Sequence, residues 1–124
     1  MPLVGKKRVI DAIDKHVSDV DKTLRGFIFQ TLASIQIGTP RDTGLAANNW
    51  FLTLDSPSSD VTASINGNAV KVDQLPRPIG GETIYFTNNL PYINRLEYDG
   101  WSDQASAGWV RVEMLKLQVA VKSL

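Results

Sequence analysis

The sequence contains no cysteine among its 124 residues. This absence excludes disulfide bonds, thiolate zinc sites, iron–sulfur clusters and cysteine nucleophiles. Histidine is nearly absent too, since His16 is the only one. A metal site or an acid–base pair built on it would need partners that no motif supplies. We therefore expect no metal, no cofactor and no enzymatic activity, and we interpret His16 as a surface residue of a helix.

An excess of charge of either sign is also missing, because 13 lysines and arginines balance 13 aspartates and glutamates. Proteins that hold nucleic acid through its phosphates usually carry a clear basic excess. The basic cluster Lys6-Lys7-Arg8 is short, and we interpret it as the solvated first turn of a helix. No apolar run has the length of a signal peptide or a membrane span, so we expect no membrane partner.

What the sequence does have is an ordinary globular composition with 43% hydrophobic residues, which suits one domain over residues 1–124. Its strongest pattern is a helix from about Lys6 to Ile37, ended by Gly38 as a glycine cap and by Pro40. Such a helix would be about 45 Å long, which is longer than a compact domain of this size. We therefore expect one end to project and to need a partner. Residues of one helix face recur at intervals of three and four, namely Ile10, Ile13, Val17, Val20, Leu24, Phe27, Thr31 and Ile35, and all but Thr31 are apolar.

The remainder predicts an α+β fold with a small antiparallel sheet, a short helix and a C-terminal helix. We expect strands at Trp50–Leu54 and Thr83–Thr87, where apolar and polar residues alternate. Weaker alternation at 61–65 and 69–72 predicts edge strands between mobile loops. A helical turn is expected to begin at Asp42 or Thr43. A short helix capped by Asn88 or Asn89 should run from Pro91 to Tyr98, and a longer one from about Ala107 to Lys122.

Large aromatic residues lie where expected elements meet loops. We place Trp50 in the core, whereas Trp101 and Trp109 suit a core position and a subunit contact equally well. The tripeptide Asp42-Thr43-Gly44 is similar to the start of an aspartic-protease motif. However, Pro40-Arg41 precede it in place of apolar residues, and no second copy follows. We therefore assign it no catalytic role.

Two stretches carry a family resemblance. Residues 39–50 (TPRDTGLAANNW) resemble the TPxDTGxxxxxW segment that follows the first helix in small tail-component proteins of tailed bacteriophages. Residues 88–111 resemble the NNLPYxxRLEYGxSxQAPxGxVR signature of the same family. Three departures affect the local loop shape: Asp99 is inserted before the glycine, Ser106 replaces a proline, and Trp109 stands where methionine is common.

The resemblance implies a structural virion protein. Members of this family are tail completion, tail terminator, neck or head–tail joining proteins, and they form rings that are commonly hexameric. We accordingly expect a ring at the tail end or the head–tail junction, in contact with other phage neck or tail proteins. It would join the tail tube to the head connector and let DNA pass through its lumen without specific binding. The chain would be made in the host cytoplasm and end in the virion.

Two other functions stay open at this point. One is a non-virion regulatory module that binds a single protein partner as a monomer or a dimer. The other is a nucleic-acid-binding factor, which the neutral composition disfavours. For the ring, we expect subunit contacts from the long helix and the 88–111 segment, with Arg95 and Glu97 paired locally or across the interface. The candidate interface residues are Arg41, Asp42, Arg95, Glu97, Tyr98, Trp101, Trp109 and Arg111.

Overall fold

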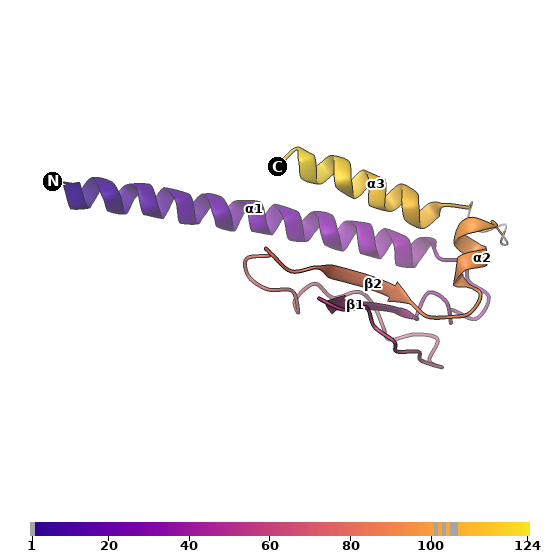
Figure 1. Cartoon of the computed structure of the whole chain (residues 1–124). Coiled ribbons are helices and arrows are strands. Elements are labelled where there is room, and N and C mark those ends of the chain that lie inside the picture. The colour runs from indigo at the N-terminus through magenta and orange to yellow at the C-terminus, as the bar shows by residue number, and fades with distance from the viewer. Residues whose placement is uncertain (1, 101, 103, 105–106) are drawn as a thin grey trace.

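A computed structural model of the chain describes residues 2–100, 102, 104 and 107–124. Its elements follow the order α1 (Pro2–Gly38), β1 (Trp50–Leu54), β2 (Ile84–Asn88), α2 (Ile93–Tyr98) and α3 (Trp109–Lys122). The fold is therefore α+β, as the sequence predicts. α1 lies in the middle, with α3 on one side and the two-stranded sheet on the other, and its N-terminal half projects well beyond the rest (Figure 1).

The two halves of α1 differ completely in burial. Every side chain from residue 8 to residue 19 is exposed, whereas Ile28, Leu32 and Ile35 in the second half are buried. This confirms that one end of the helix projects. α1 ends at Gly38, but the expectation of a glycine cap is wrong, because the positive-φ glycines of the described chain are Gly44, Gly67, Gly81, Gly100 and Gly108. A Cβ at position 38 would instead lie 3.2 Å from Cδ1 of Trp109, so glycine there permits close packing.

The core forms where α1 meets the sheet. β1 and β2 pair antiparallel, with Leu52 opposite Phe86 and Leu54 opposite Ile84. Trp50 stacks on Phe86 with ring centroids 4.9 Å apart, and its Nε1 donates a 2.9 Å hydrogen bond to Oγ1 of Thr39 at the end of α1. Trp50 is 7% exposed, so its expected core position is confirmed. Five buried residues make up the main core: Ile28, Leu32, Ile35, Trp50 and Leu75.

The segment between the strands contains no edge strand, so the predictions for 61–65 and 69–72 are wrong. Side-chain amides take the place of a third strand along β1. Asn68 donates to the carbonyl oxygen of Trp50 at 2.8 Å, and Gln74 donates to that of Leu52 at 2.9 Å. Because these carbonyl groups are satisfied individually, the segment needs no regular backbone pairing.

The helical turn expected to begin at Asp42 or Thr43 is present as a single turn at residues 45–48: the N–H of Asn48 donates to the carbonyl oxygen of Gly44 at 3.0 Å, and Thr43 Oγ1 accepts a 3.2 Å hydrogen bond from the N–H of Leu45. The short helix α2 begins differently from the prediction. α2 begins at Ile93 with Tyr92 at the cap position and no side-chain cap. Asn88 instead accepts from the backbone N–H of Leu90 and donates to the carbonyl oxygen of Ala46. It therefore tethers the end of β2 to the turn after α1 and does not cap a helix.

Candidate functional site

The predicted interface residues Glu97, Tyr98 and Arg111 meet at one place, where α2 is followed by α3. Glu97 is buried, and its carboxylate accepts hydrogen bonds from the backbone N–H groups of Val110 and Arg111, each at 3.1 Å. The guanidinium of Arg111 donates to the same carboxylate at 3.2 Å and lies 4.4 Å from the ring centroid of Tyr98. Glu97 thus satisfies the first amide groups of α3 and holds Arg111, all within one chain.

Glu97 pairs with Arg111 of its own chain, and the exposed Arg111 side chain (55%) lies over the ring of Tyr98. Tyr98 is itself 59% exposed. The pair therefore orients α3 and presents a cation and an aromatic ring to solvent. Arg95 is exposed on the same short helix.

Trp109 has a structural role as well. Its Nε1 donates a 3.2 Å hydrogen bond to the carbonyl oxygen of Ile35 near the end of α1. Its side chain packs against the main core and against a second buried cluster of Ala46, Leu90 and Leu96. The side chain is partly buried, so it joins the first turn of α3 to the last turn of α1. Trp101, the other tryptophan for which core and interface were equally suited, lies outside the described residues.

Arg41 and Asp42 lie in the loop after α1, and both side chains are exposed. The backbone of Arg41 is held by Gln104, whose amide oxygen accepts from the Arg41 N–H at 2.6 Å and whose amide nitrogen donates to the Arg41 carbonyl oxygen at 2.7 Å. This reciprocal pair connects the two stretches that carry the family resemblance. Arg41 and Asp42 line a pocket with Leu96 and Gln104, whereas Glu97, Tyr98 and Arg111 line a different one.

Two neighbouring asparagines of the 39–50 stretch, Asn48 and Asn49, hold the irregular segment between the strands by hydrogen bonds. Asn48 binds the loop at Ser64 and Asn68, and Asn49 both donates to and accepts from the backbone of Thr62 at 3.0 Å. Gly44 has a φ of +98°, and a Cβ there would lie 2.8 Å from the carbonyl oxygen of Ile65. These residues therefore serve as internal anchors of the irregular segment, and they leave contact with partners to other parts of the surface.

A charged network fixes the point where the body of the molecule begins along α1. The buried Arg25 pairs with Asp21 at 2.9 Å and donates to the carbonyl oxygens of Val72, Leu75 and Pro76. The backbone N–H of Ile79, which donates to Asp21, and then Arg25 together hold the pKa of the Asp21 carboxyl below its usual range. The 72–79 segment is thus clamped to the middle of the helix.

An apolar groove, here called the open groove, lies between α1, the sheet and α3. It has a volume of about 420 Å³. α3 contributes no buried residue to the molecule, and Met114 and Val121 in the groove wall stay 41% and 39% exposed. Each wall is entirely apolar: Leu24, Ile28, Leu32 and Ile35 of α1, Trp50, Ile79, Ile84 and Phe86 beside it, and Val110, Met114, Leu117 and Val121 of α3.

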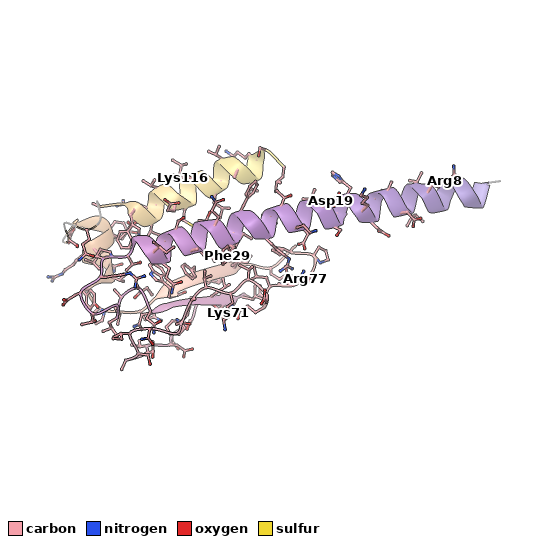
Figure 2. All side chains as sticks on the ribbon, turned by 180° about the vertical axis from the view of Figure 1, so that it is seen from behind. Arg8, Asp19, Phe29, Lys71, Arg77 and Lys116 are labelled. Carbon is pink, nitrogen blue, oxygen red and sulfur yellow. The ribbon has the colours of Figure 1, made fainter. Side chains whose placement is uncertain are left out.

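A second apolar surface, here called the projecting stripe, consists of Ile10, Ile13, Val17 and Val20 on the free half of α1. The first three are 47%, 56% and 44% exposed. Figure 2 shows the surroundings of this segment: Arg8 and Asp19 extend from a helix that has no other element beside it. The interface candidates chosen from the sequence include neither the stripe nor the groove wall of α3. The apolar residues of the stripe and of the α3 wall recur at intervals of three and four, and this spacing is the sequence signal that could have identified both surfaces.

Candidate metal ligands do not gather in the part of the chain that the structure describes. That part contains no group of three or more His, Cys, Asp or Glu side chains able to hold a metal ion. His16 lies exposed on the projecting half of α1, as expected for a surface residue. No helix of the described residues is both long and apolar enough to cross a bilayer.

Comparison with known protein families, with curated proteins and with solved structures found no match. The features of the chain that bear on its function are the projecting stripe, the open groove and the stretches 39–50 and 88–111.

Proposed function

We propose that this chain is a structural subunit of a tailed-phage virion, which forms a ring at the end of the tail or at the head–tail junction. In this position it joins the tail tube to the head connector and lets DNA pass. The observation that carries the proposal is the pair of unpartnered apolar surfaces, the projecting stripe and the open groove. A head-to-tail ring needs two different complementary surfaces on every subunit, and this chain offers two.

The energetics of the projecting half of α1 favour an assembled subunit over an isolated monomer. A helix segment with no tertiary contacts is marginal in water, because helix stability in proteins comes mostly from packing an apolar face. The projecting half of α1 has such a face and nothing of its own chain to cover it. Covering about four large aliphatic side chains contributes roughly 25 cal/mol for each Å² of apolar surface removed from water. A neighbouring subunit would supply this cover.

The test of the ring is the mass of the purified full chain, of 13.7 kDa, by native mass spectrometry and sedimentation. We expect a closed oligomer, most simply a hexamer, and the same chain in purified virions by peptide mass spectrometry. A strict monomer or dimer that is absent from virions would contradict the proposal and would favour the regulatory module that binds a single partner.

The passage of DNA gives a separate test. With 13 positive and 13 negative side chains, the assembled ring should bind duplex DNA weakly at physiological salt, since affinity for phosphates depends on net cationic contacts. Filter binding or anisotropy with a DNA fragment of arbitrary sequence measures this. Tight binding at physiological salt would instead favour a nucleic-acid-binding factor.

A further inference from the structure

An exposed loop of the irregular segment between the strands carries a dipeptide with its own chemistry. Residues 63–67 are exposed, and within them Asn66 is followed directly by Gly67. We propose that Asn66-Gly67 is a site of spontaneous deamidation, in which water is the co-reactant. The reaction requires no partner molecule, so this modification is independent of the proposed assembly.

The reaction joins two atoms of neighbouring residues. The backbone nitrogen of Gly67 attacks the side-chain carbon Cγ of Asn66, and the bond between Cγ and Nδ2 breaks. The amide nitrogen leaves as ammonia and carries away the proton of the Gly67 nitrogen, so no oxidation or reduction occurs. Water then opens the resulting succinimide ring at one of its carbonyl groups. The product at this position is an aspartyl or an isoaspartyl residue, and both carry a carboxylate in place of the neutral amide.

The glycine removes the main steric obstacle to this attack. A side chain on the residue after an asparagine hinders the approach of its nitrogen to Cγ, and Gly67 has none. Its φ of +90° is a conformation that glycine adopts without strain, and a Cβ built there would have no atom of a more distant residue within 4 Å. The space beside the dipeptide is therefore open to water.

Asn66 also differs from the other asparagines in its hydrogen bonds. Five of the seven asparagines donate from Nδ2 to backbone carbonyl oxygens, namely Asn48, Asn49, Asn68, Asn88 and Asn89. At Asn94 the attacking nitrogen is already engaged, because the N–H of Arg95 donates to the carbonyl oxygen of Tyr92 at 3.1 Å. Within the part of the chain that the structure describes, the Asn66 side chain and the Gly67 N–H make no hydrogen bond. Both reacting groups are therefore free at Asn66.

One side chain holds both sides of this loop. Nδ2 of Asn48 donates to the carbonyl oxygen of Ser64 at 2.8 Å, and Oδ1 of Asn48 accepts from the N–H of Asn68 at 2.8 Å. Asn68 in turn donates to the carbonyl oxygen of Trp50 in β1. An isoaspartyl residue inserts a methylene group into the main chain between Ser64 and Asn68, so the spacing that fits the Asn48 side chain is lost.

The two products should therefore have different effects. An aspartyl residue keeps the length of the main chain and adds one negative charge to a pocket that Arg41 also lines. An isoaspartyl residue adds the same charge and also disturbs the bonds from Asn48 to the loop. We expect the isoaspartyl form to unfold at a lower urea concentration than the aspartyl form.

Prolonged incubation of the folded full chain tests the site directly. The protein is kept at mildly alkaline pH and physiological temperature, and peptide mass spectrometry with fragmentation follows every asparagine. We expect Asn66 to exchange its amide group for a carboxyl group at a rate within one order of magnitude of that in a synthetic peptide of residues 62–70. Asn48, Asn88 and Asn94 should stay intact over the same time. A peptide that reacts while the folded chain retains Asn66, or a faster reaction at another asparagine, overturns the proposal.

Two variants separate the reaction from its effect on stability. Asn66→Gln lengthens an exposed side chain by one methylene group, which disfavours ring closure, so this position should stay unmodified with an unchanged fold. Asn66→Asp, freshly prepared, supplies the charge on a normal main chain. Enzymatic methylation by a protein isoaspartyl methyltransferase measures the isoaspartate in the aged unchanged protein. We expect a lower urea midpoint for its isoaspartyl fraction than for either variant, and an equal midpoint would overturn the inferred loss of the Asn48 bonds.

Discussion

The two halves of α1 carry apolar residues at the same spacing, yet only one half is covered. In the C-terminal half, Leu32 and Ile35 are 4% and 1% exposed, while Ile10 and Ile13 in the N-terminal half are 47% and 56% exposed. The difference arises from what lies beside the helix, since the sheet, α3 and the 72–79 segment all contact the second half. An amphipathic pattern thus indicates that a helix has an apolar face, but it does not indicate whether the same chain covers that face.

The largest expected effect is the loss of a buried side chain from the covered half. Ile35→Ala should lower the free energy of unfolding by about 4 kcal/mol, because it removes buried methyl groups and leaves a cavity. Ile13→Ala in the uncovered half should change it by less than about 0.5 kcal/mol in the monomer. Urea unfolding at concentrations where the chain is monomeric measures both. Equal losses would contradict the contrast between the two halves.

The next effect concerns the clamp where the two halves join. Arg25→Met should cost about 3 kcal/mol, since it removes charged hydrogen bonds to the carbonyl oxygens of the 72–76 segment and leaves those groups without a donor. Lys22→Met, one turn earlier and exposed, serves as the control and should change little. If Arg25→Met is as mild as its control, the clamp does not hold the segment.

A smaller effect is expected at α3, whose position relative to α1 forms the open groove. Glu97→Gln should destabilise the chain by about 2 kcal/mol, because the amide cannot accept both backbone N–H groups of α3 and also bind Arg111. The control is Glu113→Gln, which removes the ion pair between Glu113 and Lys116 on the surface of α3. Such a surface contact is worth less than about 1 kcal/mol. Thermal unfolding compares the two. A larger loss in Glu113→Gln would contradict the capping role of Glu97.

The smallest effect is a dependence on pH. Because the pKa of Asp21 is lowered in the folded chain by the Ile79 N–H and then by Arg25, the ionised carboxylate stabilises the fold above the unfolded value near about 3.9. This contribution is lost as the pH falls from there through the folded pKa. The stability gap between the unchanged protein and Asp21→Asn should therefore shrink below about pH 4. The control Asp14→Asn removes an exposed carboxylate of the projecting half and should change the stability at neutral pH by less than about 0.5 kcal/mol.

Much of the fold was predictable because it follows from local periodicity. The long helix, the strands at Trp50–Leu54 and near Ile84–Asn88, and the C-terminal helix all appear where spacing and breakers place them. The irregular segment between the strands was not predictable, because it is held by side-chain amides from distant positions. Gln36, for example, binds the backbone at Ala47, Asn68 and Val70. No local pattern reports such long-range bonds.

Several of the candidate interface residues have contacts within the chain that no local pattern indicates. Glu97, Trp109 and Arg111 have the chemistry of interface residues, yet their described contacts lie within the chain. The projecting stripe is a plain aliphatic row, and the open groove is lined by apolar side chains that include Trp50 and Phe86. Residue type alone therefore selects polar and aromatic side chains as interface candidates. The exposed fraction of each apolar side chain is needed to find which apolar rows the chain itself leaves uncovered.

The sequence by itself determined the composition limits, the absence of cysteine chemistry, the α+β class and a helix too long for its domain. These follow from residue counts and from periods of 3.6 and 2, which are local properties. Only the tertiary structure decided that Glu97 caps α3, that Trp109 joins α3 to α1, and that α1, α3 and the sheet line one apolar groove. Those features depend on contacts between residues far apart in the chain, and no local rule contains them.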